Sequence, residues 1–310
     1  LHFKPKLINE ISEVYGEQSI IVGIDLKKIN INLIMKVLMI TFIITIIWGI
    51  FNYFNGEMFI KLKSVGSPNR SAVYISLMFV LSFGLLFVKD YINKYIVYLT
   101  LLLSVFAIIF GGSRMAMYSL PLLIFVILLY SEKITLKNII YLFLGLSLIV
   151  GISVLLFPES YFARKILKGF TDPQRILLWT MAIDIWTKND LFFGIGVGNS
   201  IFFDPRDYFP ASEFTYMNNA HNTFLDMLLE RGILGLCTYL AFIFSILFKL
   251  LSLKKEFKSN ASYYNIGVFV FAVIFIMSFA NITFRYEFAY LAVVIWGLLL
   301  NKSLIQKNSN

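Results

Sequence analysis

Long apolar runs, separated by short polar segments, make up most of this chain. There are eight such runs: Val37–Phe54, Ser71–Val88, Tyr95–Phe110, Met115–Tyr130, Ile139–Phe157, Ile233–Phe248 (extending to Leu253), Tyr263–Ile282 and Tyr286–Leu300. Most reach the roughly 17–25 residues that a helix needs to cross a bilayer, and none shows the period of two of a membrane β-strand. Because backbone polar groups in hydrocarbon must bond to each other, the pattern predicts an all-α, polytopic integral membrane bundle of about eight transmembrane helices.

A long polar interruption between the fifth and sixth runs sets the predicted domain organisation. It is too long to be a simple connector, and we expect it to be an external, partly helical loop that holds the active site. The expected division is a cytoplasmic N-terminal segment at 1–36, five spans at 37–157, the long loop at 158–231, three spans at 232–300 and a cytoplasmic tail at 301–310.

Local signals within the loop predict two helices with a turn between them. Thr171-Asp172-Pro173 is a helix-start signal, and the amphipathic stretch QRILLWTMAIDIWTKND follows it. The next stretch, GIGVGNS, follows no predicted strand, so we interpret it as a flexible turn and not as a dinucleotide-binding motif. Asn218 or Asn219 is then expected to cap a short helix, with His221 in its first turn and Glu230 at its end.

Composition agrees with a membrane protein and excludes some other classes. Apolar and aromatic residues make up 59% of the chain and charged residues 15%, against about 25% charged residues in an ordinary soluble domain. The formal net charge is +9, which we attribute to orientation in the membrane. Nucleic-acid binding would need a basic, soluble face, and the sequence has none, so no nucleic-acid partner is expected.

The distribution of positive charge orients the predicted spans. With the N-terminus inside, fifteen lysines lie on the cytoplasmic side and six Lys or Arg residues lie in the short outer segments, which is the usual bias. All seven arginines then fall on the outer side, at positions 70, 114, 164, 175, 206, 231 and 285. An arginine fork binds phosphate in bidentate fashion, so this bias indicates an anionic substrate, with contact to lipid head groups as the alternative.

Three residues on separate segments are candidates for chemistry. Arg114, in GGSRMAM, lies at the outer mouth of the third and fourth runs, where an arginine beside hydrocarbon is costly; the alternative is snorkelling to head groups. Arg175 lies in the first turn of the predicted loop helix, where a cation is unfavourable for the helix dipole; the alternative is solvent exposure. His221, near a helix N-terminus, is expected to be neutral and able to act as a general base; the alternative is a capping or packing histidine.

The sequence carries no pattern for a cofactor or a metal ion. It lacks a DxD pair, a P-loop, an HExxH motif and a Cys/His cluster, so no cofactor and no metal are expected. The spans also carry almost no charge at mid-membrane, whereas an ion-coupled transporter needs ionisable groups there. A transporter or flippase for lipid-linked sugar is therefore kept only as the alternative from another class.

Five motifs in a fixed order resemble the bacterial O-antigen ligase and polysaccharide polymerase superfamily. They are SPNRSA (67–72), GGSR (111–114), QRxxLWxxA (174–182), GxGxGN (194–199) and AHNTFLDMLLERGILG (220–235). The resemblance implies a glycosyltransferase of the bacterial cytoplasmic (inner) membrane, which moves glycan from undecaprenyl diphosphate to an acceptor hydroxyl on the outer face. It implies that Arg114 and Arg175 bind the diphosphate and that His221 is the catalytic base. Supporting residues are expected from the same motifs: Ser113, Asn222, Glu230 and Asn69.

Within this superfamily, the sequence favours a polymerase for surface polysaccharide, such as capsule, O-antigen or exopolysaccharide. An Ile-, Lys- and Asn-rich composition is typical of low-GC bacteria, which favours the polymerase. A ligase that passes finished glycan to a lipid or protein acceptor shares the chemistry and stays open. The expected partners are the undecaprenyl-diphosphate-linked oligosaccharide, an acceptor glycan or lipid, membrane lipids and other polysaccharide-assembly proteins.

Overall fold

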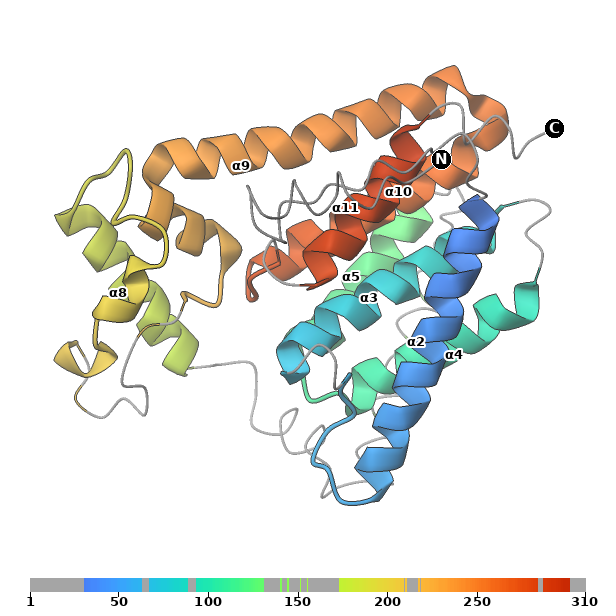
Figure 1. Ribbon diagram of the computed structural model, residues 1–310, viewed down its shortest axis with the longest axis horizontal. Coiled ribbons are helices and arrows are strands. Elements are labelled where there is room, and N and C mark those ends of the chain that lie inside the picture. Colours follow the sequence, from blue (N-terminus) through green and yellow to red (C-terminus); the bar gives the residue numbers. More distant parts are fainter. Residues whose placement is uncertain are drawn as a thin grey trace, which may run out of the picture.

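The helices of this protein form a bundle and a smaller lobe, as the computed structural model in Figure 1 shows. The structure describes residues 31–62, 67–88, 93–130, 173–208, 210, 217, 219–283 and 287–301, together with positions 140, 144, 151 and 155. All regular secondary structure in these residues is helical, which confirms the all-α prediction. The main helices are α2 (Ile31–Phe54), α3 (Pro68–Leu85), α4 (Lys94–Phe110), α5 (Arg114–Tyr130), α8 (Pro173–Lys188), α9 (Thr223–Glu256), α10 (Ala261–Ser278) and α11 (Glu287–Leu300).

Helices occupy seven of the eight apolar runs. Three helical segments are long and apolar enough to cross a membrane: Ile31–Phe54, Thr223–Glu256 and Lys258–Ser278. Shorter apolar helices cover Lys94–Phe110, Met115–Ile127 and Phe288–Leu300. The fifth run, Ile139–Phe157, lies outside the described residues except for four helical positions within it. The chain is therefore an integral membrane protein, while the total of eight spans stays a prediction.

The bundle is built around the pair α3 and α10, with α4, α5, α9 and α11 packed against one or both of them and α2 resting mainly on α4 (Figure 1). Gly84 of α3 lies directly against Ile266 of α10, and a Cβ at Gly84 would overlap this side chain. Small residues allow close approach of helices in a membrane. The indole Nε1 of Trp296 donates to the Gly267 carbonyl at 3.0 Å, so α11 is fastened to α10 within the apolar core.

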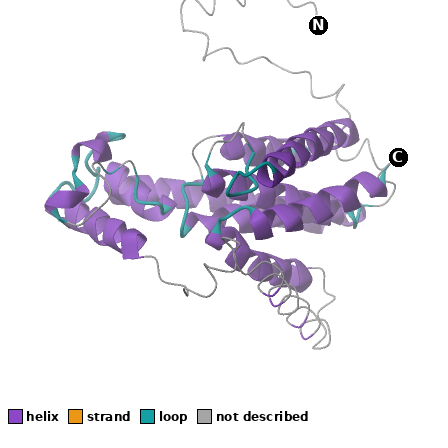
Figure 2. Cartoon of the chain, turned by 90° about the horizontal axis from the view of Figure 1, so that it is seen from below, coloured by secondary structure: helices purple, strands orange, loops and turns teal. Residues whose placement is uncertain are grey.

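A second, smaller hydrophobic core lies apart from the bundle. It consists of Leu178, Met181, Ala182, Ile185, Met217, Ala220 and Leu229. Its residues come mainly from the buried face of α8 and from the start of α9. The unit formed by α8, residues 189–208 and residues 223–231 of α9 is called the lobe below. It extends from one end of the bundle (Figures 1 and 2). α8 begins at Pro173, which confirms the predicted helix start.

A sharp break at Gly232 divides α9 into two legs. Gly232 has φ 64° and ψ −166°, a region that is essentially restricted to glycine. The legs run back along each other, since the rings of Phe224 and Tyr239, on opposite sides of the break, lie 6.2 Å apart between centroids. The first leg belongs to the lobe and the second is the long apolar helix. The predicted boundary between the loop and the sixth span, at 231/232, coincides with this break.

The turn GIGVGNS packs onto the break in α9. The backbone N–H groups of Ile195 and Gly196 donate to the carbonyls of Leu229 (2.9 Å) and Glu230 (3.0 Å). In the reverse direction, Ile233 donates to Leu191 (3.0 Å) and Leu234 to Phe192 (3.2 Å). The break removes helical partners from these groups, and the turn supplies new ones. The predicted flexible turn is thus a docked turn: two of these backbone hydrogen bonds come from the turn itself, and two go to Leu191 and Phe192 just before it.

Candidate active site

The start of α9 places His221 immediately before the helix. α9 begins at Thr223, and the side chain of Asn222 accepts hydrogen bonds from the N–H groups of Phe224 (3.0 Å) and Leu225 (3.2 Å). The prediction that Asn218 or Asn219 caps this helix, with His221 in the first turn, is wrong. Asn219 instead accepts the His221 N–H at 2.9 Å, which forms a turn before the true cap.

The backbone at His221 is unusual. Its φ is +49°, and among the described residues it is the one non-glycine with positive φ. Such a conformation persists only where neighbouring contacts hold it, and it is frequent at functional sites. Here Asp226, which is 3% exposed, accepts the Ala220 N–H at 3.3 Å. The turn before the helix is therefore held from both sides of His221, by Asn219 and by Asn222.

A network of polar side chains ties the start of α9 to the turn after α10. The Thr223 hydroxyl donates to the Asn281 carbonyl at 2.8 Å and accepts the Thr283 N–H at 2.9 Å. The amide Nδ2 of Asn222 donates to the Phe279 carbonyl at 3.0 Å. These bonds join segments about 60 residues apart in the sequence, at one end of the bundle.

Arg175 reaches the same turn from α8. Its guanidinium NH1 donates to the Ala280 carbonyl at 2.9 Å, and the residue is half-buried. Arg175 and Asn222 therefore donate to consecutive carbonyls, those of Ala280 and Phe279. Two of the three candidates, Arg175 and His221, thus belong to elements that converge on one short turn.

The third candidate segment begins α5. Arg114 is the first residue of α5, and its side chain lies outside the described part of the chain. The preceding turn is fixed, since Gly112 has φ +75° and a Cβ there would overlap the Phe59 ring. Ser113 is buried, and its hydroxyl has no hydrogen-bond partner among the described residues. The convergence of Arg114 with Arg175 and His221 stays a prediction.

The two remaining predicted supporting residues, Asn69 and Glu230, lie on separate elements. Asn69 lies half-buried in the first turn of α3, which Ser67 caps by accepting the Arg70 N–H. Glu230 is 1% exposed, accepts the Ser200 hydroxyl at 3.2 Å and lies 3.5 Å from the Arg231 guanidinium. Its contacts join the docked turn to α9, so Glu230 supports the lobe at the break and does not contact the turn after α10 in any of these bonds.

Other charged residues of the lobe have local partners. The Arg206 guanidinium pairs with Asp204, and this hydrogen bonding lowers the pKa of Asp204. Lys188 pairs with Asp184 at 2.7 Å, and this contact raises the pKa of Lys188. Both pairs are exposed and lie between residues close in sequence. Arg175 differs, because it donates to a carbonyl on a distant segment.

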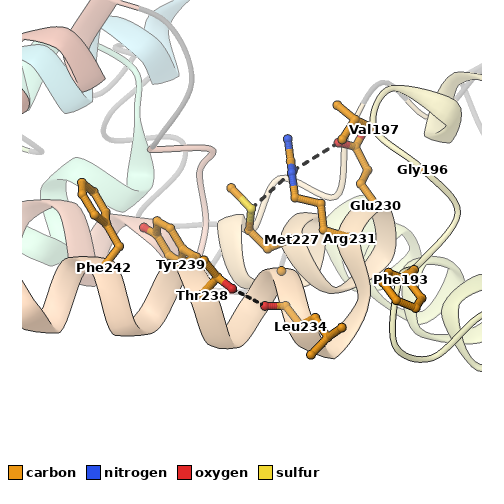
Figure 3. Close-up of a pocket in the computed structure, with 11 residues that line it drawn as sticks. Phe193, Gly196, Val197, Met227, Glu230, Arg231, Leu234, Thr238, Tyr239 and Phe242 are labelled. Carbon is orange, nitrogen blue, oxygen red and sulfur yellow. Dashed lines mark hydrogen bonds and ion pairs between the residues drawn. The ribbon is translucent and has the colours of Figure 1, made fainter.

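An open groove of about 660 Å³ lies beside the break in α9 (Figure 3). Most of its lining is apolar, and Arg231 stands at one side with its NH1 3.3 Å from the Met227 sulfur. The lining residues are Phe193, Gly196, Val197, Met227, Glu230, Arg231, Leu234, Gly235, Thr238, Tyr239 and Phe242. The groove is suited to hydrocarbon more than to a hydrated sugar.

The sequence-based prediction missed the turn after α10. The predicted seventh run extends to Ile282, whereas α10 ends at Ser278. Asn281 is 4% exposed, and its amide nitrogen has no partner among the described residues. A buried amide without a partner is costly, so Asn281 is a candidate for contact with a ligand. The available signal was the pair of polar residues in NIT at the end of an apolar run.

Comparison with known protein families gives a match for the middle part of the chain. The family model described as O-antigen ligase matches residues 99–240. The match runs from α4 to the second leg of α9 and includes GGSR, the start of α8, the docked turn and the His221 segment. A search of curated proteins found no match.

Proposed function

We propose that this chain, which carries an O-antigen ligase domain over residues 99–240, is a polymerase that transfers surface glycan from undecaprenyl diphosphate to an acceptor hydroxyl. The family match supports the superfamily predicted from the motifs and an O-antigen ligase or polymerase type of membrane glycosyltransferase. The donor, the acceptor and the roles of single residues belong to the proposal.

The observation that carries the proposal is that α8 and the start of α9 both bond to the turn after α10, at residues 279–281. Arg175 and Asn222 donate to neighbouring carbonyls there, and His221 directly precedes Asn222. Arg175 of α8 and the segment that carries His221, just before α9, are thereby brought to the same turn at one end of the bundle. Lipid diphosphate transfer needs a cation and a general base at a membrane surface.

The proposed reaction is a single displacement at the anomeric carbon of the donor sugar. His221 takes the proton of the acceptor hydroxyl, and the acceptor oxygen forms the new glycosidic bond. The bond from the anomeric carbon to the diphosphate breaks, and undecaprenyl diphosphate leaves with the electron pair. Arg175, with Arg114, would neutralise the charge on this leaving group through charge-assisted hydrogen bonds.

We further propose that the lobe lies outside the bacterial cytoplasmic membrane and that both termini are cytoplasmic. The lysine bias supports this orientation. Ser200 is fully buried against Glu230 and so is unsuitable for labelling. The exposed Lys188 is suitable: in a Cys237→Ala background, Lys188→Cys should react with an impermeant thiol reagent on intact cells. Labelling only after membrane rupture would reverse the orientation.

The test of the function is the length distribution of surface glycan after deletion of the gene. Loss of a polymerase leaves single repeat units on the surface acceptor, and complementation with the intact chain restores long polymers. The second candidate is a ligase, which the description of the matched family favours. Loss of a ligase would instead leave long chains on the lipid carrier. Unchanged surface glycan in the deletion strain would contradict both candidates.

A further inference from the structure

The docked turn and the residues on either side of it expose several large apolar side chains. Phe193 is 67% exposed and Phe202 79%, and Phe192, Val197 and Ile201 are also exposed. We call these five residues the lobe patch. Large exposed apolar patches mark contact with another protein or with a membrane, and the position of the patch along α9 distinguishes between the two.

Backbone hydrogen bonds fix the lobe patch to the second leg of α9. Ile233 donates to the Leu191 carbonyl and Leu234 to the Phe192 carbonyl, at 3.0 Å and 3.2 Å. Phe192 and Phe193 therefore lie at the level of the first turn of this leg. The height of that turn relative to the bilayer determines what surrounds the patch.

α10 belongs to a candidate membrane span, Lys258–Ser278, and we take its end at Ser278 as the edge of the hydrocarbon on this side. Tyr239 of α9 is within hydrogen-bond distance of Ser278, the last residue of α10, at 3.3 Å between hydroxyl oxygens. Leu234 precedes Tyr239 by five residues, which corresponds to about 8 Å along a helix axis. The interfacial layer of a bilayer is roughly 5–8 Å thick on each side. The first turn of the leg, with Phe192 and Phe193 beside it, thus lies in the outer part of this layer.

The patch continues a lipid-facing stripe of α9. Leu234 (48%), Phe242 (44%) and Phe248 (65%) are exposed along this helix, and Cys237 lies exposed between the first two. Phe193 and Val197 join Leu234 and Phe242 in lining the open groove (Figure 3). A mainly apolar surface therefore passes from the membrane span onto the loop, with Arg231 at one side of it.

We propose that the lobe patch is inserted into the interfacial layer of the leaflet on the lobe side, with the groove filled by lipid hydrocarbon. Aromatic side chains are favoured at this depth, and Phe192, Phe193 and Phe202 supply them. The partner is the bilayer itself, and a second copy of the chain is the competing occupant. The inference rests on the membrane-spanning helices and is independent of the proposed glycosyl transfer.

The test is the depth of spin labels in the full-length protein, reconstituted in lipid nanodiscs. Phe193→Cys and Phe202→Cys are each made in a Cys237→Ala background and labelled. The native Cys237 alone, which lies between Leu234 and Tyr239, is the interfacial reference, and Lys188→Cys, also in the Cys237→Ala background, is the aqueous reference. Collision with oxygen, which concentrates in lipid, is compared with collision with a water-soluble nickel complex.

For both patch labels, the oxygen-to-nickel collision ratio is expected to be closer to that of the Cys237 label than to that of the Lys188→Cys label. A ratio closer to that of the Lys188 label would overturn the proposal, because the patch would then lie in water. Labels shielded from both reagents would also overturn it, since a second protein copy would then cover the patch. Folding is checked in each variant by the protection of the α9 backbone against hydrogen exchange.

Discussion

The bundle and the lobe are held together in different ways. In the bundle, apolar side chains of α3, α10 and their neighbours form one large core. Among the described residues, the smaller core holds seven buried apolar side chains. The position of the lobe depends on backbone hydrogen bonds across the break at Gly232 and on bonds to the turn after α10. The bundle therefore spreads its stability over many contacts, whereas the lobe concentrates it in a few.

This difference predicts where single substitutions act. A change in the bundle should affect global stability by an amount set by local packing. A change at one polar or glycine position of the lobe should detach the candidate active site while the bundle stays folded. Local opening of this kind is separable from global unfolding by hydrogen exchange.

Gly232→Ala is expected to have the largest effect. Its φ and ψ are essentially closed to alanine, and a Cβ would overlap the backbone of Phe192. We expect a loss of about 3 kcal/mol or more in lobe docking and loss of glycan transfer. Hydrogen exchange at residues 191–196 is the measurement.

Gly198→Ala is the matched control for Gly232→Ala. Gly198 also has a positive φ, +80°, but nothing lies within 4 Å of the position of its Cβ. We expect slower exchange at the docked turn in this variant than in Gly232→Ala. Equal protection in the two variants would show that close approach at the break is not required.

Gly84→Val should have the next largest effect, and it should act on the bundle. The added methyl groups would force Ile266 and α10 away from α3, at a cost of about 1–3 kcal/mol. The measurement is thermal unfolding in detergent. Gly297→Val on α11, where a Cβ meets nothing within 4 Å, is the control, and an equal loss in both would contradict the packing account.

Ser200→Ala is expected to weaken the lobe more moderately. It removes the hydrogen bond to the buried Glu230 carboxylate, which corresponds to about 2 kcal/mol for a bond to a charged group. Exchange at the docked turn should quicken, with no change in the unfolding temperature of the bundle. Ser245→Ala, which loses an exposed hydroxyl on α9, should leave the turn unchanged.

Arg206→Ala is expected to have the smallest effect. The pKa of Asp204 is lowered by Arg206, so their pairing stabilises the folded chain at neutral pH and is lost as pH falls through the lowered value. Because the pair is exposed, its contribution is small. The substitution should raise the pKa of Asp204, as measured by NMR of labelled aspartate, and leave transfer unchanged. A large loss of transfer would place Arg206 in the site.

Sequence patterns predicted the parts that depend on local signals. Apolar runs located seven of the helices, and Thr171-Asp172-Pro173 located the start of α8. The start of α9 was misplaced, because Asn219 and Asn222 are both suitable caps and the choice depends on a distant carbonyl at Phe279. Asn281 was missed for the same reason, since its role arises from segments far apart in the sequence.

The pairing of GxGxGN with ERG was also beyond local prediction. Gly194 and Gly232 each lie where a Cβ would overlap the backbone of the other segment. Such mutual close approach is visible only once both segments are placed together. Within the motif, Gly194 allows close packing against α9, whereas a Cβ at Gly198 would meet nothing within 4 Å.

The central claim is that His221, which precedes the Asn222 anchored at the turn after α10, removes the acceptor proton during glycan transfer. The direct measurement is the transfer rate of purified His221→Ala with lipid-linked donor, next to the intact chain and Arg206→Ala. The account predicts a loss of about 10²–10⁴-fold, with unchanged protection of the lobe against hydrogen exchange, and full activity in Arg206→Ala. Full activity in His221→Ala would contradict the claim.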